Sequence, residues 1–190
     1  MRKLAVFNMI SLDGYFVDAN GDMSWAYIDR INDAEFNEFI QNNAKGGGEL
    51  VFGRKTYDLM VKHWPTPEAK QNDPVVAEGM NKMPKVVFSR TMDKAAWQNT
   101  RLVKSSMADE VRKMKNGTGV GMAILGSGEI VSQLAQEGLI DEYQMLVIPI
   151  VLGKGRTMFE GMKEKIRLKL TKSRAFANGN VFLSYVLEKN

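Results

Sequence analysis

The chain has 190 residues, of which 44% are apolar and 25% charged, as is usual for one globular domain. The net charge is +4 and the cations are scattered, which argues against a nucleic-acid-binding arm or tail. Cysteine is absent and histidine occurs once, so the sequence excludes disulfides and thiolate metal sites and disfavours a transition-metal centre.

The amino-terminal residues begin like a signal peptide, with two cations before an apolar run. Asn8 and Ser11 interrupt that run, Asp13 ends it, and no small-residue cleavage site follows. The longest apolar run, residues 145–152, is too short to cross a bilayer. We therefore predict a cytoplasmic protein that does not enter the membrane.

The chain opens with a strand, a loop and a helix. Residues 3–11 form an apolar run typical of a buried strand, and residues 12–25 hold the glycines and aspartates of a long loop. Helical spacing of apolar residues predicts a helix over 32–43, which Asn32 or Asp33 can cap.

A second strand and helix follow at 49–53 and 56–64. Pro65 and Pro67 end that helix, and we interpret the segment from there to Met83 as loosely structured.

The second half continues the alternation and then changes to strands alone. Helices are expected at 108–115 and 130–136. Pro149 lies inside the strand expected at 142–152, the sixth of the chain, and indicates a sheet edge or a bulge. Asn178-Gly179 is a hairpin signal between the last two strands. The six strands expected here are 84–90, 101–104, 121–125, 142–152, 166–176 and 181–187, with a turn at "GKGR". The pattern predicts one α/β domain with a largely parallel sheet and an antiparallel end.

Three of the predicted strands end in polar or glycine-rich loops. In open α/β sheets ligands collect at the carboxyl ends of strands, and a helix that starts there favours an anion. Taken singly, each loop is more typical of an ordinary turn with solvated cations, and the third lacks the last glycine of the G-x-G-x-x-G fingerprint. Together they predict a ligand with several phosphates. The loops are Gly53-Arg54-Lys55-Thr56, Ser89-Arg90-Thr91 and Gly126-Ser127-Gly128-Glu129.

Longer motifs around these loops resemble the dihydrofolate reductase superfamily, and most closely its riboflavin-biosynthesis branch, the RibD C-terminal domain. They are "NMISLDGYFVDANGDMSW", "LVFGRKTYDLM", "KVVFSRT" and "ILGSGEIVSQLAQEGLIDEYQMLVIPIVLGKG". The resemblance covers about residues 3–160. It implies a single domain with the dihydrofolate reductase-like fold: a mostly parallel eight-stranded sheet with an antiparallel C-terminal strand, and helices on both faces.

The resemblance also implies NADPH as the cofactor. It assigns the loop from Gly53 to Thr56 to the phosphates, and Ser89, Arg90 and Thr91 to the adenosine side, where Arg90 would hold the 2′-phosphate. It places Gly126, Ser127 and Gly128 at the pyrophosphate, with Glu129 and Ile130 beside them, and Asn8 near the nicotinamide. Relatives often carry consecutive glycines and a cis peptide at the position of Gly126-Ser127.

On the substrate side, the resemblance places the loop from Ser11 to Trp25 over the nicotinamide, with Ser11, Asp13 and Trp25 as substrate-binding candidates. Asp29 and Asp33 are the candidates for the carboxylate that binds the substrate and helps to protonate it. Asp33 is also a good helix cap, and a cap is the commoner role for such a residue. Arg30 stands at the spacing from Trp25 that the carboxylate would take, which argues against a dihydrofolate reductase proper.

The resemblance therefore implies an NADPH-dependent reductase of a small heterocyclic or carbonyl substrate. Its nearest named activity is 5-amino-6-(5-phosphoribosylamino)uracil reductase, or that of a free-standing paralogue with another substrate. The alternatives are a dihydrofolate reductase proper and a non-catalytic protein that binds NADP(H) or a flavin nucleotide. By resemblance we also expect a homodimer, with the strand at 142–152 and its following loop as the interface.

Overall fold

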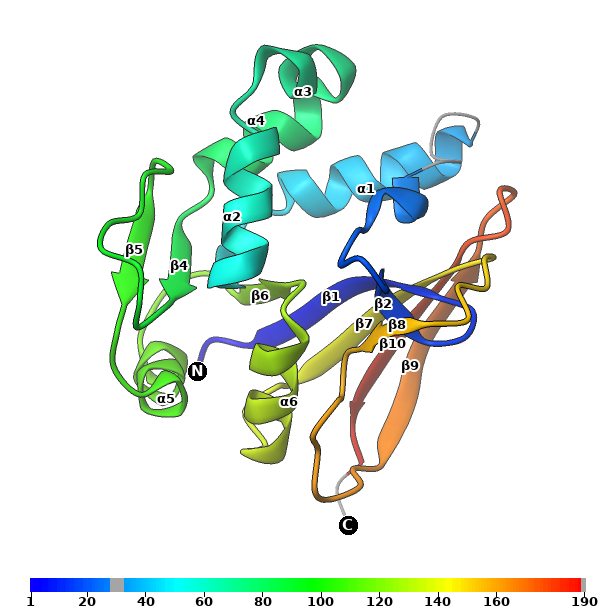
Figure 1. Cartoon of the computed structure of the whole chain (residues 1–190). Helices are drawn as coiled ribbons and strands as arrows, with labels where there is room; N and C mark the ends of the chain where they lie inside the picture. Colours follow the sequence, from blue (N-terminus) through cyan, green and yellow to red (C-terminus); the bar gives the residue numbers. More distant parts are fainter. Residues whose placement is uncertain (28–32, 189–190) are drawn as a thin grey trace.

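An eight-stranded sheet forms the centre of the computed structural model, which describes residues 1–27 and 33–188 (Figure 1). The strand order is β5-β4-β3-β6-β1-β7-β10-β9. All pairs from β5 to β7 are parallel, whereas β10 runs antiparallel to both of its neighbours. The strands are β1 (Leu4–Ser11), β3 (Glu49–Gly53), β4 (Lys85–Phe88), β5 (Thr100–Val103), β6 (Met122–Leu125), β7 (Glu142–Ile148), β9 (Leu168–Ala175) and β10 (Val181–Leu187).

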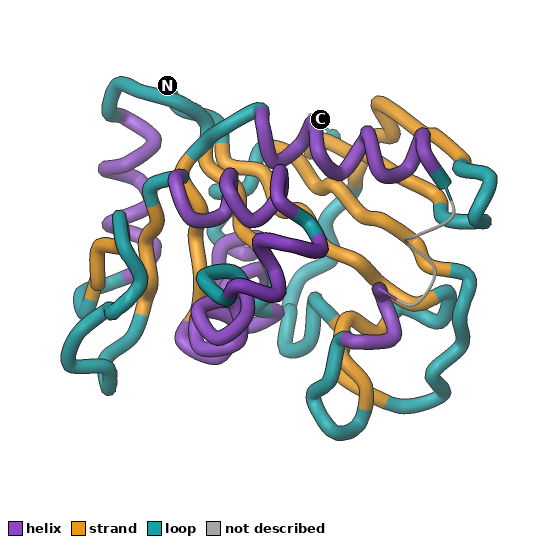
Figure 2. The backbone as a smooth tube through the Cα atoms, turned by 90° about the horizontal axis from the view of Figure 1, so that it is seen from above, coloured by secondary structure: helices purple, strands orange, loops and turns teal. Residues whose placement is uncertain are grey.

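Helices cover both faces of this sheet (Figure 1). One face carries α1 (Ala34–Lys45), α2 (Arg54–His63), α3 (Pro67–Asn72) and α4 (Pro74–Lys82), and the other carries α5 (Met107–Asn116) and α6 (Gly128–Gln136). Seen from above, helices lie in front of the strands of the sheet (Figure 2). The predicted fold class is confirmed.

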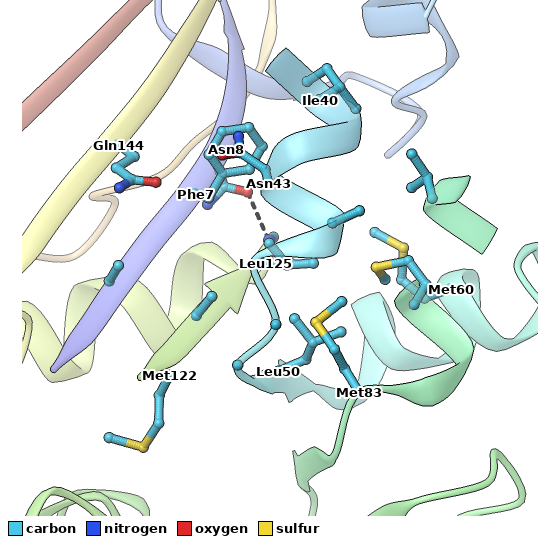
Figure 3. A pocket seen from close by; sticks show the side chains of 18 of the residues that line it. Phe7, Asn8, Ile40, Asn43, Leu50, Met60, Met83, Met122, Leu125 and Gln144 are labelled. Carbon is cyan, nitrogen blue, oxygen red and sulfur yellow. Dashed lines mark hydrogen bonds between the residues drawn. The ribbon is translucent and has the colours of Figure 1, made fainter. Parts of the chain in front are cut away.

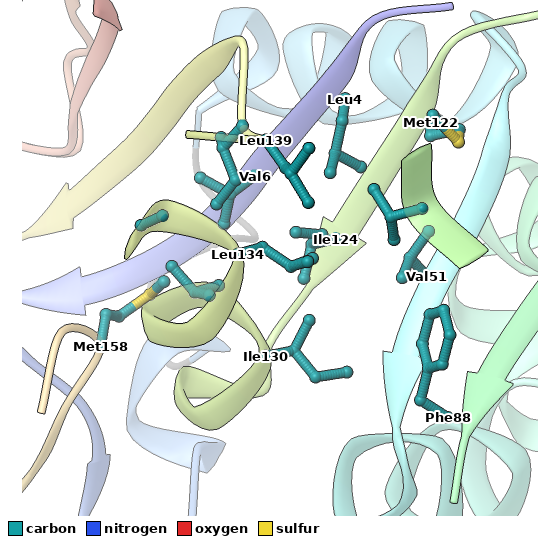
Figure 4. Close-up of a cluster of buried hydrophobic side chains, with 14 of the residues drawn as sticks. Leu4, Val6, Val51, Phe88, Met122, Ile124, Ile130, Leu134, Leu139 and Met158 are labelled. Carbon is teal, nitrogen blue, oxygen red and sulfur yellow. The ribbon is translucent and has the colours of Figure 1, made fainter. Parts of the chain in front are cut away.

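Two apolar cores result, one on each face of the sheet. Strand β3 shows why residues 50–52 are all apolar: Val51 packs on the α6 side, and its neighbours Leu50 and Phe52 pack on the α1 side. Figure 4 shows the first core, in which Leu134 of α6 lies close to Ile124 of β6.

The predicted loose segment after residue 64 is wrong, because the structure forms α3 and α4 there. Proline begins each of these helices, and the N1 position tolerates it because that residue's N–H has no partner in the helix. The Thr66 hydroxyl caps α3 by accepting a hydrogen bond from the backbone N–H of Ala69. The prolines therefore mark helix starts as well as the end of α2.

The predicted loop at 12–25 and the "GKGR" turn contain strands. β2 (Tyr15–Asp18) pairs antiparallel with β8 (Gly155–Thr157) in a small second sheet, and the 3-10 helix η1 (Ser24–Tyr27) follows. These two segments are about 140 residues apart in the chain, so their pairing leaves no local signal in either of them.

The sixth predicted strand is shorter than expected, because β7 ends at Ile148, directly before Pro149. The expected sheet edge or bulge is also wrong, since β7 lies between β1 and β10. The sheet edge on this side is β9, whose residues are mostly exposed.

Candidate functional site

The loops after β3 and β6 contact each other at the carboxyl edge of the parallel strands. A Cβ atom added to Gly53 would lie 2.2 Å from Ser127 Oγ, and one added to Gly126 would lie 2.7 Å from Thr56 Cγ2. Contacts this close leave no room for a side chain at either glycine. The structure therefore brings together two of the three predicted loops as a tightly packed cradle.

Asn8 joins this cradle to the first strand. Its side chain is buried, and its Oδ1 accepts a hydrogen bond of 2.7 Å from the backbone N–H of Gly126. Its Nδ2 is also buried, yet it has no hydrogen-bond partner among the described residues. An unpaired buried donor is costly, so this amide group is suited to an acceptor on a bound ligand.

Two helix N-termini open toward the cradle. In the described structure no side chain caps α2 or α6, so the N–H groups of both first turns stay available to an anion. The backbone turns sharply here: Gly126 and Ser127 have φ of 64° and 62°, and the described residues contain no cis peptide. Arg54 and Lys55 are exposed on the first turn of α2 and add positive charge.

The third predicted loop is joined to the same place through Arg54, whose Nη1 donates a hydrogen bond of 2.6 Å to Thr91 Oγ1. Ser89 shapes this loop, because its hydroxyl accepts from the backbone N–H groups of Thr91 and Met92. Arg90 between them is exposed. All three loops predicted from the sequence therefore lie at one edge of the sheet.

Two residues that the sequence analysis missed complete the cradle. A Cβ atom added to Gly128 would lie 2.9 Å from Cε1 of Phe16 on β2 and 3.3 Å from the carbonyl oxygen of Met158. The β2–β8 sheet therefore packs against the start of α6. Of the two neighbouring candidates, Glu129 is exposed and Ile130 is buried in the core (Figure 4).

Ser11 and Asp13 form a hydrogen-bonded turn after β1. The Ser11 hydroxyl donates to Asp13 Oδ1, and the two carboxylate oxygens accept from the backbone N–H groups of Leu152 and Gly153. The Ser11 hydroxyl, opposed by partial burial and helped by those N–H groups, holds the pKa of Asp13 below its ordinary value. Both side chains thus hold the loop after β7 in place.

The carboxylate candidates have separate positions. Asp33 is the N-cap of α1, as predicted: its Oδ1 accepts from Phe36 N, and its Oδ2 accepts from the backbone N–H of Asn178 in the last hairpin. The Phe36 N–H, opposed by burial and helped by Asn178, keeps the pKa of Asp33 low, so this group is ionised at neutral pH. Asp29 lies outside the described residues. Trp25 is buried, and its Nε1 donates to the carbonyl oxygen of Asp22.

A cavity of about 340 Å³ lies beside the cradle, between the sheet and α1 and α4 (Figure 3). Asn8 and Gly126 line one end of it, where it meets the loops described above. Strands β1 and β6 form its floor, and Ile40 and Asn43 of α1 lie above them (Figure 3). Sequence reasoning missed this cavity, because α4 was not predicted.

Residues 1–27 and 33–188 contain neither a cluster of metal ligands nor a membrane-spanning helix. No group of three or more histidine or acidic side chains is placed to hold a metal ion. None of the helices in these ranges has the length and apolarity that a membrane crossing requires.

Solved structures resemble the chain over nearly its whole length. A Shewanella sp. PV-4 protein whose name assigns it to riboflavin biosynthesis is 23% identical with a TM-score of 0.74, and the match covers 98% of this chain and 99% of that one. The Thermotoga maritima deaminase and 5-amino-6-(5-phosphoribosylamino)uracil reductase is 13% identical with a TM-score of 0.66, and the match covers 98% of this chain and 57% of that one. Enterococcus faecalis dihydrofolate reductase complexed with NADP(H) is 14% identical with a TM-score of 0.63, and the match covers 98% of this chain and 97% of that one. These likenesses show the fold.

The family is given by the sequence itself. The family model of the RibD C-terminal domain matches residues 2–182. The chain therefore belongs to the RibD C-terminal domain family.

Proposed function

We propose that the chain is an NADPH-dependent reductase, and that the loops after β1, β3, β4 and β6 hold the dinucleotide. The observation that carries the proposal is the contact of Gly53 with Ser127 and of Gly126 with Thr56, beside an Asn8 amide with an unpaired donor. Because Gly53 and Gly126 have no side chains, the two loops pack closely and bring the uncapped N-termini of α2 and α6 together, where their N–H groups can bind phosphate groups. The dinucleotide complex of the Enterococcus faecalis relative supports the choice of ligand.

In this proposal Gly53, Arg54, Lys55 and Thr56 hold phosphate groups at the start of α2. Gly126, Ser127 and Gly128 face the pyrophosphate, with Glu129 and Ile130 on the following turn. Ser89, Arg90 and Thr91 lie on the adenosine side, and Arg90, whose side chain is exposed and can form a bidentate pair, contacts the 2′-phosphate. Asn8 donates from Nδ2 to the nicotinamide end of the ligand.

NADPH supplies a hydride, and the protein residues position the substrate and exclude water. We propose that the substrate is a small ring compound or carbonyl compound and lies beneath the loop that carries Ser11, Asp13 and Trp25, whose Met23 lines the cavity beside Asn8. Asp33 and Asp29 are the carboxylates proposed to act on it. Because Asp33 is ionised, we propose that it acts by charge and that the proton comes from water. The Thermotoga maritima relative supports a reductase, and the resemblance supports a homodimer.

A titration of purified protein with NADPH, and separately with NADH, tests the cofactor by quenching of tryptophan fluorescence. We expect NADPH to bind more tightly than NADH, and Arg90→Gln to remove that difference. Arg167→Gln is the matched control, because Arg167 is an exposed arginine beside the start of β9. Equal binding of both dinucleotides by the unmodified protein would remove the role of Arg90, and binding of neither would reject the reductase.

A second titration, with a flavin nucleotide in place of NADPH, tests the alternative ligand. Consumption of NADPH with a panel of carbonyl compounds then separates an enzyme from a non-catalytic binder. Tight binding without turnover of any compound would favour the binder.

A further inference from the structure

The cavity beneath α1 has an apolar lining along most of its length. Strand residues with side chains on the α1 side form the floor, and α1, α2 and α4 contribute the walls and roof (Figure 3). Six of the lining residues are methionines, whose flexible thioethers adapt to apolar ligands of varied shape. They are Met9, Met23, Met60, Met80, Met83 and Met122.

Charge is scarce in this cavity. Among the described lining residues Lys3 is the one with an ionisable side chain, at the end far from Asn8. Glu142 on the neighbouring strand interacts with it: burial raises the pKa of Glu142, but hydrogen bonds from Gln144 and Ser184 and the charges of Lys172 and Lys3 hold that pKa below its ordinary value. Lys3 is thus the one cation that the described lining offers a phosphate, and it lies far from the dinucleotide loops.

Both helices over the cavity end beside it. Asn43 and Ala44 in the last turn of α1, and the following Gly47 and Gly48, line the cavity. A helix C-terminus carries partial negative charge, so the end of α1 disfavours an anion there. The C-cap residue of α4, Met83, also lines the cavity, but the Lys85 ammonium donates to the carbonyls of Asn81 and Met83 and offsets the partial charge at that end.

We propose that this cavity is the substrate site and that its substrate is a neutral, apolar ring compound with a conjugated carbonyl group, not a phosphoribosyl-pyrimidine. The inference rests on the proposed function, because Asn8 and Gly126 place one end of the cavity beside the dinucleotide loops. In the reaction the substrate carbon accepts a hydride, its oxygen accepts a proton from water, and NADPH becomes NADP⁺.

A binding experiment with a fluorescent ketone tests this inference without turnover. The probe is 6-propionyl-2-(dimethylamino)naphthalene, a neutral aromatic ketone whose emission moves to shorter wavelength in apolar surroundings. We expect saturable binding with that shift, and no displacement by uridine 5′-phosphate, which carries the pyrimidine, sugar and phosphate of the other substrate class. Displacement by uridine 5′-phosphate would overturn the inference.

A matched pair of variants locates the probe. Ala123→Leu fills part of the cavity from β6 and should weaken probe binding about tenfold, whereas Ala175→Leu on the exposed strand β9 should leave it unchanged. Unchanged binding in Ala123→Leu would overturn the inference. NADPH titration of the unmodified protein reports the cofactor site separately: absence of probe binding with intact NADPH binding rejects only the substrate class, whereas probe binding without NADPH binding rejects only the reductase.

Discussion

Gly53 and Gly126 are glycines for a steric reason. At both positions a Cβ atom would overlap an atom of the facing loop, and Gly126 also has a positive φ. The backbone of these two residues also forms the proposed phosphate site, so both the packing of the loops and phosphate binding require glycine at these positions.

The substitution Gly53→Ala tests whether glycine is required at this position. Its Cβ would lie 2.2 Å from Ser127 Oγ and 3.3 Å from Ser127 Cβ, so the Ser127 side chain must rotate or the β6–α6 loop must shift. We expect NADPH affinity to fall about tenfold or more and the free energy of unfolding to fall by about 1–3 kcal/mol. Fluorescence titration and urea unfolding measure the two effects. Gly117→Ala is the control, because its φ is negative and its nearest contact is 3.4 Å; equal effects in both variants would contradict the steric argument.

Asp33 has two possible roles, as the cap of α1 and as a carboxylate that acts on the substrate. A cap needs only an acceptor oxygen, whereas the catalytic role needs the negative charge. Asparagine caps a helix about as well as aspartate, but it carries no charge. We expect Asp33→Asn to keep the cap on α1 but to lose the hydrogen bond from the Asn178 N–H, at a cost of about 1 kcal/mol, and Asp33→Ala to lose both hydrogen bonds, at a cost of about 2 kcal/mol. Urea unfolding measures this. If Asp33 also acts on the substrate, kcat falls in Asp33→Asn under conditions in which the variant stays folded; a kcat equal to that of the unmodified protein would leave the structural role as its only one.

At the scale of elements, one ion pair fastens α5 to the start of β7. Lys115 Nζ and Asp141 Oδ2 lie 2.5 Å apart, and the Lys115 side chain is only 6% exposed. Asp141 Oδ2 also accepts from the backbone N–H of Leu4, so one carboxylate joins three elements.

Asp141→Asn should therefore be costly. It keeps the side-chain shape but leaves the buried ammonium of Lys115 without its counter-charge, which we expect to lower the free energy of unfolding by about 2–3 kcal/mol. The control Glu78→Gln removes an exposed ion pair with Lys82 and should change stability by less than about 0.5 kcal/mol. Urea unfolding of both variants decides the point, and similar losses would show that burial does not matter here.

The sequence predicted every strand of the main sheet. The buried parallel strands are apolar runs that end in polar loops, and the hairpin signal at Asn178-Gly179 marks β9 and β10. It failed where structure depends on residues distant in the chain. β2 and β8 are short and pair only with each other, so neither shows the length or alternation of an independent strand.

In the site, too, residues in local sequence patterns were predicted, and contacts between distant segments were missed. Arg54, Thr56 and Ser127 stand in local strand–loop–helix patterns and were predicted. Phe16 approaches Gly128 through the second sheet, and the cavity forms only where α1 and α4 cross above β1 and β6. The prolines at 67 and 74 could have indicated α3 and α4, since each follows a residue that favours the position before a helix, Thr66 or Asp73.

At the scale of the whole molecule, stability should depend on pH through Lys85. This side chain is 1% exposed, and its ammonium donates to the backbone carbonyls of Asn81, Met83 and Gln98 while lying over the ring of Trp97. Burial lowers the pKa of Lys85 from 10.5 to about 8.

Between about pH 8 and 10.5 the unfolded chain therefore holds a proton that the folded chain has lost, so this group makes stability rise with pH. We expect the stability of the unmodified protein relative to Lys85→Met to increase by on the order of 1 kcal/mol between about pH 8 and 9.5. Urea unfolding of both proteins across this window measures the change. A constant difference would show that the folded and unfolded chains hold this proton equally well.

The methionine lining of the cavity has one more consequence. The chain has no cysteine, so its oxidisable sulfur lies in methionine, and six of its 13 methionines surround the proposed substrate. Peroxide converts a thioether into a polar sulfoxide, which would place a strong dipole in a wall built for apolar contact. Mild oxidation should thus impair binding in this cavity before it unfolds the domain, and methionine sulfoxide reductases would restore it.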